Sequence, residues 1–148
     1  MKLSINLILF AIIIYNLIKR KNNIFHAIIP TTAIISGFAL LLICLYIWYS
    51  YDKTRSGLTM AIAAVISFMS QFLAQGISKN GIQGFEPKLI IVRTIPFDRI
   101  SYIGLKEDDS KITLTINAFS TAFIQSYDIR LKDDIISHLD IDMDYQNN

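Results

Sequence analysis

The segment that decides the fold is IIPTTAIISGFALLLICLYIWY, residues 28–49. It carries no charge, and as an α-helix it would extend about 33 Å, enough for the roughly 30 Å hydrocarbon core of a bilayer. Pro30 lies in the first turn, where a missing backbone N–H matters little. Amphipathic aromatic rings settle at headgroup depth, and four of them lie at or just beyond the end of the segment: Tyr46, Trp48, Tyr49 and Tyr51. The segment therefore predicts a transmembrane helix that ends in an aromatic belt.

Two further apolar runs flank this segment. Residues 3–18 precede it and would extend about 24 Å as a helix, and residues 58–77 follow it. The first run could instead be a signal peptide, but no pair of small residues precedes Lys19 as a cleavage site. We therefore predict three transmembrane helices, at about 3–18, 28–49 and 58–77, within a transmembrane region of residues 1–76.

Small residues four positions apart mark where helices pack in lipid, because they let two backbones approach closely. Ala33 and Gly37 have this spacing in the second run, and Ala63 and Ser67 have it in the third. We expect these four residues to lie where the helices pack.

A basic cluster follows the first run: Lys19, Arg20 and Lys21. Positive charge is retained on the cytoplasmic side of a membrane, so the cluster sets the orientation. Its three cations could also bind anionic lipid headgroups. We expect a multi-pass protein of the cell membrane, with the lipid bilayer as one partner and the C-terminal domain in the cytoplasm.

The amino-acid composition also indicates that about half of the chain lies in lipid. Of the 148 residues, 53% are hydrophobic and only 18% are charged, which is apolar for a soluble domain of this length. The net charge of +2 and the lack of any basic stripe between aromatic residues exclude nucleic acid as a partner. Cys44 is the single cysteine, so there is neither a disulfide nor a zinc site built from several cysteines.

Residues 77–148 change to short runs with a period of two, separated by turn residues, which is typical of a small antiparallel sheet. The predicted strands are 88–94, 97–105, 111–117 and 122–129. Leu131, Ile135 and Leu139 then form one apolar stripe of a helix at 131–141. The sequence predicts an α+β domain, an antiparallel sheet with a closing C-terminal helix, followed by an acidic tail.

This C-terminal part resembles the small pleckstrin-homology-like (PH-like) domains of bacterial membrane proteins of unknown function, of the low-GC Gram-positive type. The resemblance covers about residues 76–140 and depends on KNGI at 79–82, on the strand at 88–94, and on IPFDRI at 95–100, which leads into the next strand. It implies a domain that binds or scaffolds, and no catalytic activity. It assigns no lipid-binding residue to this chain.

No pattern for catalysis, cofactor binding or metal binding is present in the sequence. The two histidines, His26 and His138, are isolated from each other. The tail spaces Asp140, Asp142 and Asp144 as a calcium loop does, but it lacks the turn glycine and the final glutamate of that loop. We expect no enzyme, no cofactor and no metal, and a solvated acidic tail.

Arg93 and Arg99 come from neighbouring predicted strands and could form a docking patch for an anion, although two arginines on a strand pair are also common on a solvated face. The function we predict is a non-enzymatic, membrane-anchored interaction or regulatory module that acts through its cytoplasmic PH-like domain. The partner would be a membrane or cytoplasmic protein, or a second copy of the chain. The alternatives are a self-immunity protein against a bacteriocin or toxin and an accessory subunit of a transporter or signalling complex.

Overall fold

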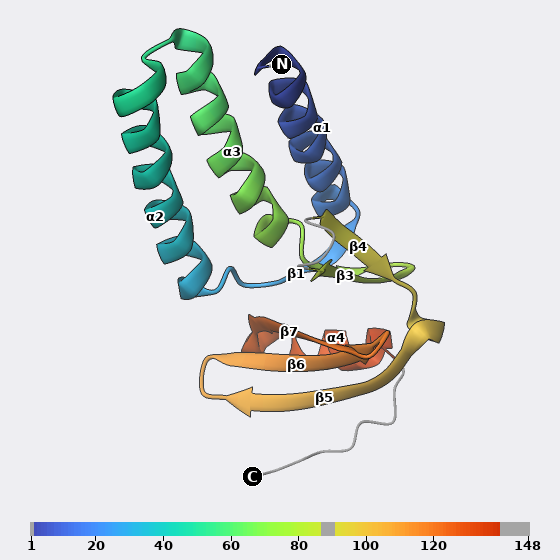
Figure 1. Cartoon of the computed structure of the whole chain (residues 1–148). Coiled ribbons are helices and arrows are strands. Elements are labelled where there is room, and N and C mark those ends of the chain that lie inside the picture. Colours follow the sequence, from blue (N-terminus) through green and yellow to red (C-terminus); the bar gives the residue numbers. More distant parts are fainter. Residues whose placement is uncertain (1, 87–90, 140–148) are drawn as a thin grey trace.

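The computed structural model describes residues 2–86 and 91–139. Three long helices stand side by side in one layer, with antiparallel strands and a short helix at one end of them (Figure 1). The protein is therefore a mixed α+β structure with a separate helical layer, as the sequence predicts at this level.

The helical layer consists of α1 (Lys2–Lys21), α2 (Thr31–Ile47) and α3 (Arg55–Leu73). A π-helical turn, Trp48–Asp52, continues α2 to the tip of the hairpin that it forms with α3. The hydroxyl of Thr54 accepts a hydrogen bond from the backbone N–H of Gly57 and caps the start of α3.

Two helical segments of the described chain are long and apolar enough to cross a membrane: Thr31–Asp52 and Arg55–Leu73. The prediction of three spans is therefore wrong in number. The first run does form a helix, but its apolar part is short and its last turn is basic: Lys19, Arg20 and Lys21. Charged side chains in that turn are costly in the hydrocarbon core, so they shorten the length of α1 that could lie in it.

The inner faces of the helices carry small residues. Ala33 and Ala63 are only 3% and 2% exposed, and Gly37 and Ser67 are also buried. A Cβ on Gly37 would lie 2.4 Å from the sulfur of Met69 on α3. The helices α2 and α3 therefore pack closely at Gly37, because glycine has no side chain. All four residues predicted to lie where the helices pack are in the interior of the layer.

The first sheet has four antiparallel strands in the order β1 (Asn23–His26), β2 (Gly76–Ser78), β3 (Gly81–Glu86) and β4 (Ile91–Ile95). Its edge strand β1 comes from the chain between α1 and α2, although its partner β2 follows α3. The helical hairpin is thus inserted between two neighbouring strands. The predicted boundary between a transmembrane region (1–76) and a C-terminal domain (77–148) places β1 in the transmembrane region, whereas β1 belongs to the first sheet.

The second sheet is a meander of β5 (Ile100–Asp108), β6 (Lys111–Ala118) and β7 (Thr121–Asp128). A short 3-10 turn then leads into α4 (Lys132–Leu139). Both sheets and α4 share one core, since Ile82 of the first sheet, Leu114 of the second and Ile135 of α4 belong to the same buried cluster. The predicted antiparallel sheet with a closing helix is present, but as two sheets.

The predicted strand boundaries agree best with the structure where apolar and polar residues alternate. The strand expected at 111–117 is β6, and the one at 122–129 is β7 shifted by one residue. The strand at 97–105 starts later, at Ile100, because Phe97–Arg99 form a 3-10 turn after Pro96. Part of the strand expected at 88–94, the end of the helix expected at 131–141 and the acidic tail fall outside the described residues.

Candidate functional site

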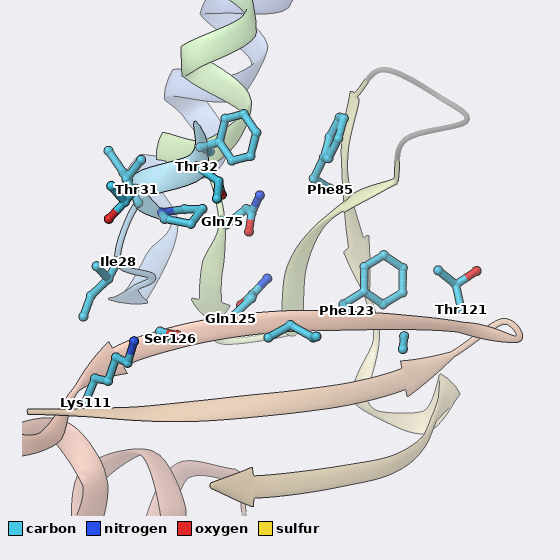
Figure 2. A pocket seen from close by; sticks show the side chains of 15 residues that line it. Ile28, Thr31, Thr32, Gln75, Phe85, Lys111, Thr121, Phe123, Gln125 and Ser126 are labelled. Atoms are coloured by element: carbon cyan, nitrogen blue, oxygen red, sulfur yellow. The ribbon is translucent and has the colours of Figure 1, made fainter. Parts of the chain in front are cut away.

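A groove of about 500 Å³ separates the helical layer from the second sheet. Figure 2 shows Thr31, Thr32 and Gln75 on the helical side, with Gln125 and Ser126 of β7 opposite. The remaining labelled side chains come from the linker before α2 and from strands β3, β6 and β7: Ile28, Phe85, Lys111, Thr121 and Phe123. We refer to this cavity as the β7 groove.

One edge of β7 is open along the β7 groove. Its other edge pairs with β6 in an unbroken register from Ala118–Thr121 to Lys111–Asp128. The backbone N–H of Ile28 donates to the carbonyl of Ser126 at 2.7 Å, so the main chain of Ser126 faces the groove. In an antiparallel strand the backbone groups of every second residue face the same side. The N–H and C=O of Ala122 and Ile124 therefore face the groove as well.

The linker between β1 and α2 occupies one end of this edge. Ala27 donates its N–H to the carbonyl of Gln75 at 3.2 Å, and Ile28 donates to Ser126. The linker thus binds β7 as a short added strand would, but it turns away at Pro30 into α2. The edge beyond it, toward Thr121, has no such neighbour among the described residues.

Two phenylalanine rings, those of Phe85 and Phe123, form the far end of the groove (Figure 2). The ring of Phe85 also packs against Phe72 of α3, with 5.9 Å between the ring centroids. Among the described residues that line the cavity, Lys111 is the single charged one. An apolar wall, an open strand edge and one cation favour an extended peptide with alternating side chains.

Gln125 fixes β7 against the first sheet. Its Nε2 donates to the carbonyl of Gln83 at 2.7 Å, and its Oε1 accepts a hydrogen bond from the hydroxyl of Tyr127. Both side chains are buried, and burial raises the pKa of the Tyr127 phenol far above its usual value. The phenol stays protonated and remains a donor to Gln125 at any physiological pH.

The predicted basic cluster divides between two roles. Lys19 donates from Nζ to the hydroxyl of Thr94 on β4, and Arg20 donates from Nη1 to the carbonyl of Leu73 at 3.3 Å. Lys21 is exposed. Two of the three cations thus attach α1 to the first sheet and to the end of α3, which the sequence does not indicate.

The two arginines of the predicted docking patch have different surroundings. Arg93 lies over the ring of Phe119, with 4.7 Å from its guanidinium carbon to the ring centroid. Arg99 is in the 3-10 turn after Pro96, and its Nε is 3.9 Å from a carboxylate oxygen of Asp98, with both side chains largely exposed. Each arginine has its own neighbour, and neither lines the β7 groove.

The histidines lie apart from the groove. The ring of His138 on α4 makes edge contacts with Phe25 and Phe97, at centroid distances of 5.8 and 6.2 Å. His26 is on β1. Within residues 2–86 and 91–139, His, Cys, Asp and Glu side chains nowhere gather in a group of three that could hold a metal ion.

Sequence reasoning missed the β7 groove. The strand at its centre was predicted, but the groove also needs the linker 27–30 and Gln75, which belong to segments far apart in the sequence. The one usable signal was Pro30, which starts α2 and stops the linker from pairing further along β7.

Comparison with known protein families, with curated proteins and with solved structures gives no match for this chain.

Proposed function

We propose that the protein is a non-enzymatic, membrane-anchored interaction module. The helical hairpin α2–α3 would hold it in the cell membrane, and a PH-like domain made of the two sheets and α4 would bind an extended segment of a partner protein in the β7 groove. The observation that carries this proposal is the open edge of β7, which the linker occupies at one end only.

The insertion of the hairpin supports anchoring. Because β1 and β2 are neighbours in the sheet, the domain is joined to α2 and α3 through both of them. A domain held by two adjacent strands keeps its position at the end of the helices, whereas one on a single linker would move freely. The groove is thereby presented at a constant depth below the helical layer.

The basic end of α1 supports a cytoplasmic domain. Lys19, Arg20 and Lys21 lie at the end of α1 that joins β1 (Figure 1). By the positive-inside rule this end faces the cytoplasm, and the sheets lie on the same side. The far tip of the hairpin, with the aromatic rings of Trp48, Tyr49 and Tyr51, would face the outer surface of the membrane.

The mode of binding that the groove favours is the addition of a partner strand to the open edge of β7. A partner strand would extend the row of hydrogen bonds that Ile28 starts at Ser126, using the backbone groups of Ile124 and Ala122. Its apolar side chains would contact Phe85 and Phe123, and a carboxylate on it would meet Lys111. Main-chain hydrogen bonds would supply affinity, and these side-chain contacts would supply specificity.

The test is site-specific photocrosslinking of the intact protein in its native membrane. A photoreactive residue at position 124, where the isoleucine is 68% exposed, should give one discrete protein adduct. The same residue at Lys106, which is exposed on β5 at the opposite edge of the same sheet, should give none.

A second variant tests the mode of binding. Ile124→Pro removes the one N–H at this position, which faces the groove, and leaves the hydrogen bonds between β6 and β7 in place. It should abolish the adduct of a photoreactive residue at Thr121. A position 124 that crosslinks only to lipid, or an adduct that persists with proline, would exclude strand addition.

A further inference from the structure

A second cavity, separate from the β7 groove, lies where α1 meets the first sheet. Its volume is about 360 Å³, within the range of roughly 300–1,000 Å³ typical of small-molecule sites. The residues of the described chain that line it are all polar or cationic: Lys19, Asn22, Ser78, Lys79, Asn80, Gln83 and Thr94. No carboxylate is among these lining residues.

A chain of hydrogen bonds fixes one wall of this cavity. Lys19 donates to the hydroxyl of Thr94, which donates to Oε1 of Gln83 at 3.0 Å. Gln83 in turn donates to the hydroxyl of Ser78 at 3.4 Å, and Ser78 donates to the carbonyl of Gly81 at 2.7 Å. All donors point in one direction, away from the ammonium group, and no carboxylate of the described residues pairs with Lys19 at the cavity.

The opposite wall is the turn between β2 and β3, with Lys79 and Asn80. Both side chains are exposed, whereas Ser78 and Gln83 behind them are only 5% and 3% exposed. The ammonium groups of the two lysines and the side-chain amides of the two asparagines supply N–H donors for a compact oxyanion. Apolar ligands would leave these donors without partners.

We propose that this cavity binds a phosphate-type monoanion, with Lys19 and Lys79 as its cations and Asn22 and Asn80 as neutral donors. Lys19 follows the apolar run of α1, and the ring of Tyr15 lies 5.3 Å from its Nζ. Tyrosine and lysine at the end of an apolar helix are characteristic of headgroup depth in a membrane. The phosphate of an anionic phospholipid headgroup is the ligand that this depth supplies.

The experiment measures lipid retention by the full-length protein in neutral detergent, with phosphatidylglycerol and phosphatidylcholine as probes, by native mass spectrometry. The wild type should retain phosphatidylglycerol in preference to phosphatidylcholine. Lys79→Gln should weaken that retention about fivefold, since a lysine near a membrane surface contributes about 1 kcal/mol. Lys21→Gln is the matched control, because Lys21 is exposed on the same turn of α1 as Lys19 but does not line the cavity. Since it leaves every donor of the cavity in place, it should weaken retention less than Lys79→Gln does.

Glycerol phosphate and inorganic phosphate form the second arm. If either of them displaces phosphatidylglycerol from the wild type at millimolar concentration and not from Lys79→Gln, the cavity accepts a free phosphate. Displacement by neither soluble anion assigns the cavity to the lipid headgroup. Equal retention of the two lipids, or equal effects of Lys79→Gln and Lys21→Gln, would overturn the proposal.

Lys79 is exposed, so its substitution leaves the fold intact. Lys19→Gln, which also breaks the bond to Thr94, is a second variant that should weaken retention further.

Discussion

The helical layer and the sheet region use the same apolar residues in opposite ways. On α2 the large side chains point outward, with Ile35 and Phe38 64% and 63% exposed, while small residues such as Ala33 are buried. In the sheets the large side chains are inside, and Ile82 and Leu114 are completely buried. A surface of exposed isoleucine, leucine and phenylalanine around an interior of alanine, glycine and serine is the arrangement expected of helices in lipid.

The contrast shows what holds each region together. The sheets gain stability by removing large apolar surface from water. The helices cannot gain it in that way if lipid surrounds them, and they depend on close backbone contact and on hydrogen bonds between helices. Asn16 of α1 makes a hydrogen bond between helices: it is 1% exposed and donates to the hydroxyl of Ser70 on α3 at 2.8 Å.

The largest expected effect is at the joint between the two regions. Gly76 starts β2 with φ of 154°, and an added Cβ would lie 2.2 Å from the carbonyl oxygen of Phe25 on β1. Gly76→Ala should therefore separate β1 from β2 and destabilise the protein by more than about 3 kcal/mol. Thermal unfolding of the purified protein in detergent measures this.

The control for that substitution is Gly104→Ala on β5. The nearest atoms to a Cβ there would be those of the Tyr102 side chain, whose ring can move. It should lower the unfolding temperature by a few degrees at most. Equal stability of Gly76→Ala and the wild type would show that the hairpin is not joined to the sheet through these two strands.

The next effect tests the sheet core. Tyr127→Phe removes the hydroxyl that donates to Gln125 and leaves a buried acceptor without a donor, which should destabilise the protein by about 1–3 kcal/mol. Tyr102→Phe, at an exposed position, is the matched control and should have no measurable effect. If both substitutions leave the unfolding temperature unchanged, the link between Tyr127, Gln125 and the first sheet carries no stability.

A smaller effect is expected where α2 and α3 pack. Gly37→Ala would place a methyl group against the sulfur of Met69 and should destabilise the helix pair by about 1–2 kcal/mol. Met69→Ala should restore much of that loss in the double variant, because it removes the opposing side chain. On the outer face, Ile35→Leu should be neutral. A double-mutant cycle with no coupling between Gly37 and Met69 would contradict this packing.

The smallest effect is on the solvated face of the sheet. Nε and Nη2 of Arg130 donate to the carboxylate of Asp128, at 2.9 and 2.7 Å, and these bonds lower the pKa of Asp128 to about 2. The stabilisation by this pair is complete above the ordinary aspartate pKa and is lost as the pH falls toward 2. In Arg130→Gln, carboxyl NMR should show the pKa of Asp128 raised toward its usual value but still below it, because the backbone N–H of residue 130 also donates to this carboxylate. An unchanged titration would mean that Arg130 does not set it.

The parts of the fold that the sequence predicts well are those with a strong local pattern. β6 alternates apolar and polar residues along its whole length, and α2 is uncharged and long. Three strands were missed. β1 has four residues between two helices, and β3 follows directly after the turn at 79–80. β2 begins at Gly76, within the third helix predicted at 58–77, whereas α3 ends at Leu73, so that prediction is wrong for residues 76 and 77.

The reason for these misses is pairing between distant segments. β1 is a strand because it lies beside β2, not because of its own residues, and it brings the linker to β7. The basic cluster was predicted from its charge, but the contacts of Lys19 with Thr94 and of Arg20 with Leu73 arise from the same pairing. Both cavities lie between segments that only the fold brings together.

The central proposal is that the helical hairpin α2–α3 lies in the membrane and the sheets lie in the cytoplasm. Maleimide labelling of single-cysteine variants tests it directly, with Cys44→Ser as the background for Ile35→Cys on α2 and Lys106→Cys on β5. The account predicts that the cysteine at 35 resists a membrane-impermeant maleimide in right-side-out and inverted vesicles, and that the cysteine at 106 reacts only in inverted ones. A cysteine at 35 that reacts as fast as the one at 106, or a cysteine at 106 that reacts in right-side-out vesicles, would contradict it.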